Sequence, residues 1–388
     1  MEELFVERLK GKDCKELIAL IDEVFTLHNG TVMDFATLFP RIAVEDDEKM
    51  SWYYAIRENG KLVGCAASHP FNYRVGGEVL KVSSGGNVAV DNACRNRGFM
   101  QKMMHAINAD MEPEGFDFAI LHGDRKRYRT FGFERCGIEY TVTFNRSSVK
   151  LSGAEANLTL SDLRNEPAEV LAEVMEIAKA QTGYVERKDE EWIPALLTHY
   201  GEPLVIRNAA GEIIGYTALS IKEATIRELA LKNADDLGHV IASLIAYSNL
   251  DSLYIRMAEY DALLSQAVAL SSRYQIIQPG NFRIVRFDNT VRAFMKAKSA
   301  YAPLLDGVLT VDTALFGKWA IEVKDGNVTV TAFDGVADLV IPDYQLHSFI
   351  FGPVHPIVSG VDCSKLSADK AKLVGNWFPL PIFFPHLT

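Results

Sequence analysis

Residues 87–133 have the side-chain types and spacing that could bind an anion and move a proton. Residues 87–90, Asn-Val-Ala-Val, form a short apolar run that predicts a buried strand. The polar, glycine-containing residues 91–98 follow and predict a tight turn into a helix. Apolar side chains at positions i, i+3, i+4 and i+7 then predict one buried face of that helix: Met100, Met103, Met104 and Ile107.

The junction between this strand and this helix predicts an anion site. The first N–H groups of a helix have no partner within the helix, and its N-terminus is the positive end of the helix dipole. A pyrophosphate is the kind of ligand that such a turn binds. Arg95 and Arg97 add positive charge to the turn. We therefore expect the backbone amides of residues 95–100 to hold a phosphorylated ligand.

Two motifs in this stretch resemble those of the GCN5-related N-acetyltransferases, the GNAT superfamily. Residues 95–100, Arg-Asn-Arg-Gly-Phe-Met, are similar to motif A, Arg/Gln-x-x-Gly-x-Gly/Ala, with Met100 in place of the last small residue. Residues 128–133, Tyr-Arg-Thr-Phe-Gly-Phe, look like motif B, and a strand-like run at residues 116–121 lies between the two. The alternative is a basic loop on an unrelated α/β domain. The resemblance implies acetyl-CoA as co-substrate and no metal.

The resemblance assigns coenzyme binding to the strand and to the loop. In the family, the main chain at the positions of Val88 and Val90 binds the pantetheine arm and polarises the thioester carbonyl. This requires the strand to separate from its neighbour, because strand amides are otherwise paired. As side chains, both valines are expected to pack in the core. The expected coenzyme-binding residues are Val88, Ala89, Val90, Arg95, Asn96, Arg97, Gly98, Phe99 and Met100.

Tyr128 stands at the position of the family's general acid. A phenol is neutral near pH 7 and can protonate a coenzyme A thiolate. The alternative is a structural tyrosine that closes the domain. His122 is expected to be a hydrogen-bonded loop residue, and Cys94 has no role in direct acetyl transfer.

Composition and charge exclude several classes of protein. The net charge of −11 argues against general nucleic-acid binding. No apolar run approaches the roughly 20 residues that span a bilayer, so we expect no membrane segment. The acidic start, Met-Glu-Glu, is unlike a signal peptide. The 5 cysteines include no CxxC pair, which favours a cytoplasmic location without disulfides or a zinc site.

The order of predicted elements divides the chain into modules at residues 1–146, 147–281 and 282–388. The first begins with an amphipathic helix at residues 14–25 and has hairpins at Asn59-Gly60 and Gly76-Gly77 before the motif A strand.

The second and third modules are expected not to bind coenzyme. The second repeats the element order of the first faintly, but residues 232–238 lack Arg-x-x-Gly and contain Asp235 and Asp236, which would repel a pyrophosphate. The third begins with a strand-like run at residues 282–287 and contains a hairpin at Asp325-Gly326.

The three modules together resemble the Eis (enhanced intracellular survival) acetyltransferases. That family has an α+β fold class, with a catalytic GNAT domain, a degenerate GNAT domain and a sterol-carrier-protein-like C-terminal domain. The resemblance implies a homo-oligomer, a hexamer in the family, and a terminal carboxylate that acts as base in the active site. Here this carboxylate belongs to Thr388, and the apolar, proline-stiffened residues 378–387 suit a docked tail. A docked tail with a purely structural role is the alternative.

These features predict an N-acetyltransferase that moves acetyl directly from acetyl-CoA to a primary amine. The acceptor stays open, because an aminoglycoside, a polyamine and a protein lysine all present this group. The alternative is a non-catalytic protein that binds acyl-CoA or a lipid through the GNAT pocket or the third module. Phe25, Phe35 and Trp52 could line the acceptor cleft, although core packing is the default for each.

Overall fold

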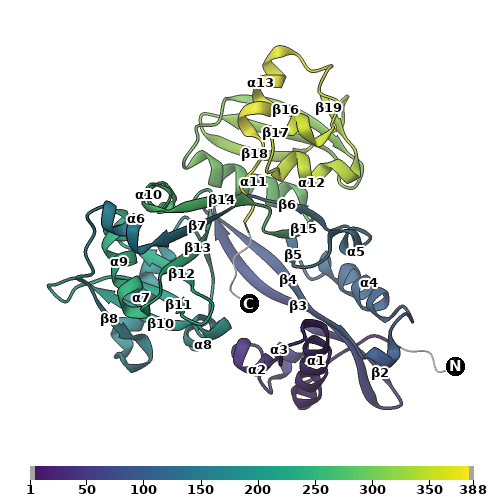
Figure 1. Ribbon diagram of the computed structural model, residues 1–388. Coiled ribbons are helices and arrows are strands. Elements are labelled where there is room, and N and C mark those ends of the chain that lie inside the picture. The colour runs from purple at the N-terminus through teal and green to yellow at the C-terminus, as the bar shows by residue number, and fades with distance from the viewer. Residues whose placement is uncertain (1–4, 384–388) are drawn as a thin grey trace.

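The computed structural model describes residues 5–383 and builds them around three β-sheets, each with its own helices (Figure 1). The N-terminal sheet lies at the lower right of the view, the second at the left and the third at the top. The mixed α and β fold class is confirmed.

The first sheet has the strand order β1-β2-β3-β4-β5-β15-β6, with β9 paired to β3. Its strands are β1 (Glu7–Arg8), β2 (Tyr53–Glu58), β3 (Lys61–Val75), β4 (Glu78–Val90), β5 (Phe118–Leu121), β6 (Glu134–Cys136), β9 (Gly183–Val185) and β15 (Gly280–Ile284). The predicted hairpins are confirmed, since β2–β3 and β3–β4 pair antiparallel. Asn59 and Gly60 both have positive φ, as a type I′ turn requires.

Helices α1 (Cys14–Asn29) and α4 (Phe99–Met111) cover opposite faces of this sheet. Side chains alternate along β2, so that Tyr53 packs with α1 and Tyr54 packs with α4. The connections contain α2 (Phe35–Leu38), α3 (Asp47–Met50), α5 (Arg125–Arg129), and the 3₁₀ helices η1 (Gly11–Asp13) and η2 (Asn92–Cys94).

The second sheet has the order β14-β7-β13-β12-β11-β10-β8. Its strands are β7 (Glu139–Asn145), β8 (Thr159–Asp162), β10 (Glu202–Arg207), β11 (Ile213–Ser220), β12 (Thr225–Leu231), β13 (Ser252–Ala258) and β14 (Arg273–Ile277). Its helices are α6 (Arg146–Leu151), α7 (Ala168–Lys179), α8 (Trp192–Leu196), α9 (Leu237–Ser248) and α10 (Leu264–Leu270), with 3₁₀ helices η3 (Leu163–Asn165), η4 (Asp189–Glu191), η5 (Thr198–Tyr200) and η6 (Ala234–Asp236).

The third sheet has the order β18-β17-β16-β19. Its strands are β16 (Gly307–Thr313), β17 (Gly317–Lys324), β18 (Asn327–Ala332) and β19 (Leu339–Ile341), and its helices are α11 (Phe287–Ser299), α12 (Asp343–Phe351), α13 (Ala368–Trp377) and η7 (Pro356–Ser359). The predicted Asp-Gly hairpin joins β17 to β18.

Two strands cross the module boundaries expected from the sequence. Strand β7, expected at the end of the first module, pairs with β13 and β14 in the second sheet. Strand β15, expected to open the third module, lies between β5 and β6 in the first sheet. The modules are therefore tied together by shared sheets, while the boundaries at residues 146 and 281 stay predictions.

Within residues 5–383, no helix is both long and apolar enough to cross a membrane. The same residues contain no group of histidine, cysteine or carboxylate side chains placed to hold a metal ion.

The β3–β4 hairpin fits closely against α11, and this contact gives a testable prediction. A Cβ on Gly76 would lie 2.5 Å from the Ala293 carbonyl oxygen and 2.6 Å from the Ala297 nitrogen, whereas a Cβ on Gly77 would meet nothing within 4 Å. Gly76→Ala should therefore lower the free energy of unfolding in urea by ~2–4 kcal/mol. Gly77→Ala, also at positive φ, is the control and should cost only about 1 kcal/mol of backbone strain. Equal losses would show that the hairpin tip does not depend on its contact with α11.

Candidate active site

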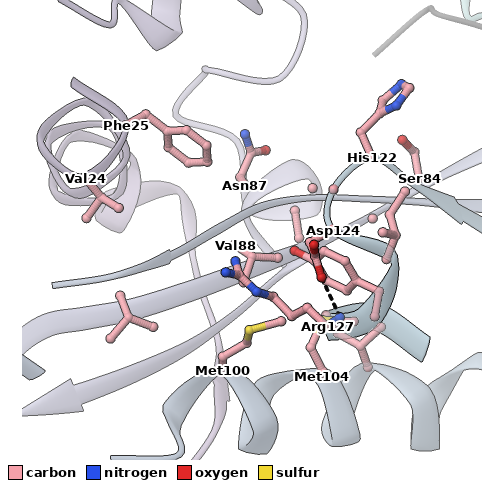
Figure 2. A pocket seen from close by; sticks show the side chains of 18 of the residues that line it. Val24, Phe25, Ser84, Asn87, Val88, Met100, Met104, His122, Asp124 and Arg127 are labelled. Atoms are coloured by element: carbon pink, nitrogen blue, oxygen red, sulfur yellow. Dashed lines mark hydrogen bonds between the residues drawn. The ribbon is translucent and has the colours of Figure 1, made fainter. Parts of the chain in front are cut away.

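A cavity of about 1540 Å³ opens between α1, β4, α4 and the second module. Figure 2 shows Val88 on β4 between the two helices, with Met100 and Met104 rising from α4 and Val24 and Phe25 from α1. Both candidate motifs contribute to the lining, so the fold brings together residues that lie far apart in the sequence.

The motif A loop forms one wall of this cavity. Gly98 is the N-cap of α4 and has φ +77°, a conformation that favours glycine, and Asn96 is also left-handed. Within residues 5–383, no side-chain hydrogen bond caps the helix, so the first N–H groups of α4 face the loop without an intrahelical acceptor. The loop residues that line the cavity are Arg95, Asn96, Gly98, Phe99 and Met100. This wall can bind an anion.

The two arginines of the loop differ in their surroundings. Arg95 lines the cavity. Arg97 donates hydrogen bonds of 2.9 and 2.6 Å to the two carboxylate oxygens of Glu58. The charge of Arg97 is therefore balanced by Glu58, and no sequence pattern predicts this pair. Cys94 is buried, and burial raises the pKa of its thiol, which makes it a poor nucleophile.

Strand β4 separates from β5 beside this loop. The two strands pair in parallel only from Val82 to Gly85, although β4 remains paired with β3 as far as Val90. A β-bulge places Asn87 and Val88 opposite the single residue Ala66, and Asn87 takes φ +49°. Beyond Gly85, the edge of β4 that faces β5 therefore has no strand partner among the described residues. Val88 and Val90 line the cavity, whereas Ala89 is buried on the α1 side.

Tyr128 lines the cavity from α5 and is only 7% exposed. Burial raises the pKa of its phenol, so the hydroxyl is protonated at neutral pH. The ring packs against Gly123, where a Cβ would lie 2.5 Å from the Tyr128 Cε2 atom. Asp124 accepts a hydrogen bond from the Arg127 N–H at the start of α5 (Figure 2). These contacts fix the tyrosine at the wall.

The four basic residues of α5, which are Arg125, Lys126, Arg127 and Arg129, differ in their surroundings. Arg127 lines the cavity. Arg125 and Arg129 both pair with the buried carboxylate of Glu134, with an Arg129 Nε–Glu134 Oε2 distance of 3.3 Å. Two of the four basic residues of α5 therefore hold this helix to β6 through Glu134.

A further part of the cavity lining comes from α1 and the segment after it and is mainly apolar. Val24, Phe25, Met33, Phe39 and Ile42 line it. Of the three aromatic residues considered for the acceptor cleft, Phe25 lines this cavity. Phe35 and Trp52 are not among the lining residues and are buried in the core behind them.

His69 forms part of the same wall and is 3% exposed. Its ring lies edge-on to Trp52 and Tyr53, at centroid distances of 5.8 and 5.2 Å. Among the described residues, its Nε2 atom has no hydrogen-bond partner. Burial, helped by the nearby Arg41 charge, lowers the pKa of His69 to about 3, so the imidazole is neutral at pH 7.

The second module closes the cavity with residues that the sequence did not single out. Glu223 lies 3.3 Å from His199 Nδ1 and 3.2 Å from Arg227 Nη1. The His199 ring meets Phe39 of the first module edge-on at 4.9 Å. Arg256 also lines the cavity and lies 3.7 Å from Glu139. No motif marks these residues, because they reach the cavity only through the packing of two modules.

The described part of the tail ends close to this junction. The Leu380 N–H donates to the Ile350 carbonyl oxygen at 2.7 Å, and the Ile138 N–H donates to the Ile382 carbonyl oxygen at 3.1 Å. Phe383 lines a smaller cavity of about 130 Å³ together with Arg227 and Arg256, which also line the main one. Thr388, the expected source of the catalytic base, lies outside the described residues.

Comparisons with known proteins agree with this geometry. Residues 6–136 match the family model of the acetyltransferase (GNAT) domain. A GCN5-related N-acetyltransferase from Anabaena variabilis ATCC 29413 has a similar structure, with 16% identity, 97% of each chain covered and a TM-score of 0.70. A probable N-acyltransferase from Enterococcus faecalis V583 is similar at 16% identity, 98% coverage of each chain and a TM-score of 0.69.

Eis1 from Mycobacterium abscessus is also similar, with 16% identity, 98% of this chain and 99% of that chain covered and a TM-score of 0.64. The comparison with curated proteins gave no match. Residues 6–136 therefore form a GNAT acetyltransferase domain within a chain that has the multi-domain GNAT fold over nearly its whole length, and the chain is an acyltransferase.

Proposed function

We propose that this chain transfers an acetyl group from acetyl-CoA to a primary amine. One observation carries the proposal: the anion-binding loop, the separated edge of β4 and Tyr128 all line the same cavity. Acetyl transfer needs these three features side by side, because the coenzyme must be held, its thioester polarised and its thiolate protonated.

In this proposal the coenzyme follows the wall formed by the loop and β4. The free N–H groups at the start of α4 and the side chain of Arg95 bind its pyrophosphate. The unpaired edge of β4 at Val88 and Val90 offers main-chain groups to the pantetheine arm and to the thioester carbonyl. A buried peptide group without a partner is costly, so a ligand that pairs with this edge gains from doing so.

The reaction is a direct transfer from the coenzyme to the amine within this cavity. The amine nitrogen forms a bond to the acetyl carbon, the carbon–sulfur bond breaks, and the sulfur leaves as a thiolate. Tyr128 donates its phenolic proton to that thiolate, and a base removes the extra proton from the amine. The terminal carboxylate of Thr388 stays the predicted base, and the position of Phe383 beside Arg227 supports a tail that leads towards the cavity.

The first module is proposed to hold the single coenzyme site. In the second module, α9 begins after η6, which contains Asp235 and Asp236. Their carboxylates place negative charge where the first module has Arg95 and Gly98. On the family resemblance alone, we also propose a cytoplasmic location and a homo-oligomer. The same resemblance proposes a degenerate GNAT fold for the second module and a sterol-carrier-protein-like fold for the third.

The loop gives the first test of this proposal. Gly98→Asp places a carboxylate at the expected pyrophosphate position and should weaken coenzyme A binding at least ~30-fold in a calorimetric titration, because an unpaired charge would be buried against the phosphates. Gly98→Asn is the control, since it has the same size and also tolerates a left-handed φ. Equal weakening by both variants would trace the effect to backbone strain, and two equivalent coenzyme sites per chain would contradict the single-site proposal.

Tyr128→Phe tests the general acid. The variant should lower kcat for acetyl transfer by roughly 10²–10⁴-fold, with little change in coenzyme affinity, because only the proton donor is removed. Thiol release with a panel of primary amines measures the rate. Tyr274→Phe, on the exposed face of β14, is the control. Unchanged turnover of Tyr128→Phe, with the chemical step rate-limiting, would assign Tyr128 a structural role.

The predicted base is tested at the end of the tail. Residues added beyond Thr388 should abolish transfer, because they move the carboxylate away, whereas Thr388→Ala keeps that carboxylate and should retain activity. Coenzyme A should bind equally to both variants, since the loop is unchanged. A folded, extended enzyme with the activity of the original chain would place the base elsewhere.

A further inference from the structure

We infer that Arg227 and Arg256 of the second module hold the end of the chain and position its terminal carboxylate, that of Thr388, in the main cavity. This inference rests on the proposed function and names the groups that place its predicted base. It gives the second module a part in the reaction that needs no coenzyme site of its own. The two arginines are positioning residues, because they act through the carboxylate.

Arg227 and Arg256 stand next to each other where two strands of the second sheet part. Strands β12 and β13 run parallel, and in the described chain their pairing ends at Ile226 and Ile255. The arginines are the next residue on each strand. Both line the main cavity and also the smaller cavity of about 130 Å³. The two guanidiniums are therefore placed between the two cavities.

The described tail leads into the smaller of these cavities. Phe383, its last described residue, lines that cavity together with the two arginines. The Ile138 N–H donates to the Ile382 carbonyl oxygen at 3.1 Å, so the tail is anchored just before this point. Five residues follow Phe383 and span at most about 17 Å when extended. The carboxylate of Thr388 is therefore within reach of both guanidiniums and of the main cavity.

Both guanidiniums can bind a further carboxylate in addition to the partners that they already have. Arg227 Nη1 lies 3.2 Å from Glu223, and Arg256 Nε lies 3.7 Å from Glu139. A guanidinium carries five N–H donors in a fork that matches carboxylate oxygens, so one such pair does not saturate it. Burial raises the pKa of Glu139 to about 7, so this group carries only part of its negative charge near neutral pH.

The pair of positive charges favours an anion at this place, and the tail carries one. Burial lowers the pKa of Arg227, and the neighbouring charge of Arg256 lowers it further. An anion beside both guanidiniums offsets their repulsion, and they in turn keep a carboxylate ionised and able to accept a proton. Residues 384–388, Phe-Pro-His-Leu-Thr, contain no acidic side chain, so the terminal carboxylate is the anionic group of this segment.

Digestion of the whole protein by a carboxypeptidase measures how firmly the tail is held. Arg256→Gln removes the charge of a side chain that is 37% exposed, so the core stays closed. The variant should release Thr388 at least ~10-fold faster, because a docked end must leave its site before it is cut. Arg273→Gln, on the exposed edge strand β14, is the matched control and should be digested like the original chain. Equal rates for Arg256→Gln and the original chain would overturn the inference.

A chain that ends in a carboxamide at Thr388, made by ligation of a synthetic tail peptide, tests the carboxylate itself. In the original chain, Arg256→Gln should lower kcat for acetyl transfer at least ~10-fold without a change in coenzyme A affinity. In the carboxamide chain, the same substitution should change the residual kcat by less than about twofold, because the charge that Arg256 holds is already gone.

Two kinetic results would contradict this role of Arg256. A loss of kcat of equal size in both chains would show that Arg256 only supports the fold. Weaker coenzyme A binding by Arg256→Gln, with an unchanged rate of digestion, would assign the guanidinium to the phosphates of the coenzyme.

Digestion and turnover together separate this inference from the proposed function. A tail that Arg256→Gln releases, in a protein that transfers no acetyl group, would contradict acetyl transfer and retain the arginines as the groups that hold the tail. Full turnover by a variant whose tail is released would overturn the positioning role while leaving acetyl transfer established.

Discussion

Strand β4 pairs with β5 only from Val82 to Gly85. The position at which this pairing ends determines where the cavity opens beside β4. The bulge at Asn87 and Val88 turns the strand at that point, and asparagine suits the position because it tolerates a left-handed φ better than other non-glycine residues. The parting strands leave room beside the start of α4 for a long, thin ligand. They also leave main-chain groups of β4 that have no strand partner in the described part of the chain, each of which costs about 1–3 kcal/mol if it is buried and unpaired. Under the proposed function, the coenzyme supplies the missing partners.

The exchange of strands between the modules holds this opening in shape. The chain passes from β6 in the first sheet to β7 in the second through Gly137 and Ile138. A Cβ on Gly137 would lie 2.9 Å from the Ile382 carbonyl oxygen, and the Ile138 N–H donates to that oxygen, so the crossing point and the tail fit each other closely. Because β15 returns from the second module to complete the first sheet, the two sheets cannot move apart without breaking strand pairs. Glu223 and His199 are therefore held beside Phe39 and the other apolar residues with which the first module lines the cavity.

What could be predicted from the sequence follows from how local each feature is. The turns at Asn59-Gly60 and Asp325-Gly326 and the helix after Gly98 depend on neighbouring residues, and the structure has them as expected. The partner strands of β7 and β15 depend on pairing between distant segments, which no short pattern encodes. The Glu58 partner of Arg97 is 39 residues away. It belongs to a hairpin for which the sequence predicts the turn but not the contacts of its side chains. For the same reason, no sequence pattern predicts which residues of the second module line the cavity.

The apolar character of the cavity connects both proton transfers of the proposed reaction. Burial raises the pKa of Tyr128, which keeps its proton available for a thiolate. Burial has the opposite effect on a cation and lowers the pKa of an ammonium group, so an acceptor bound against Phe25 and Phe39 gives up its proton more readily than in water. The base then has to take a proton from an amine that is already close to neutral.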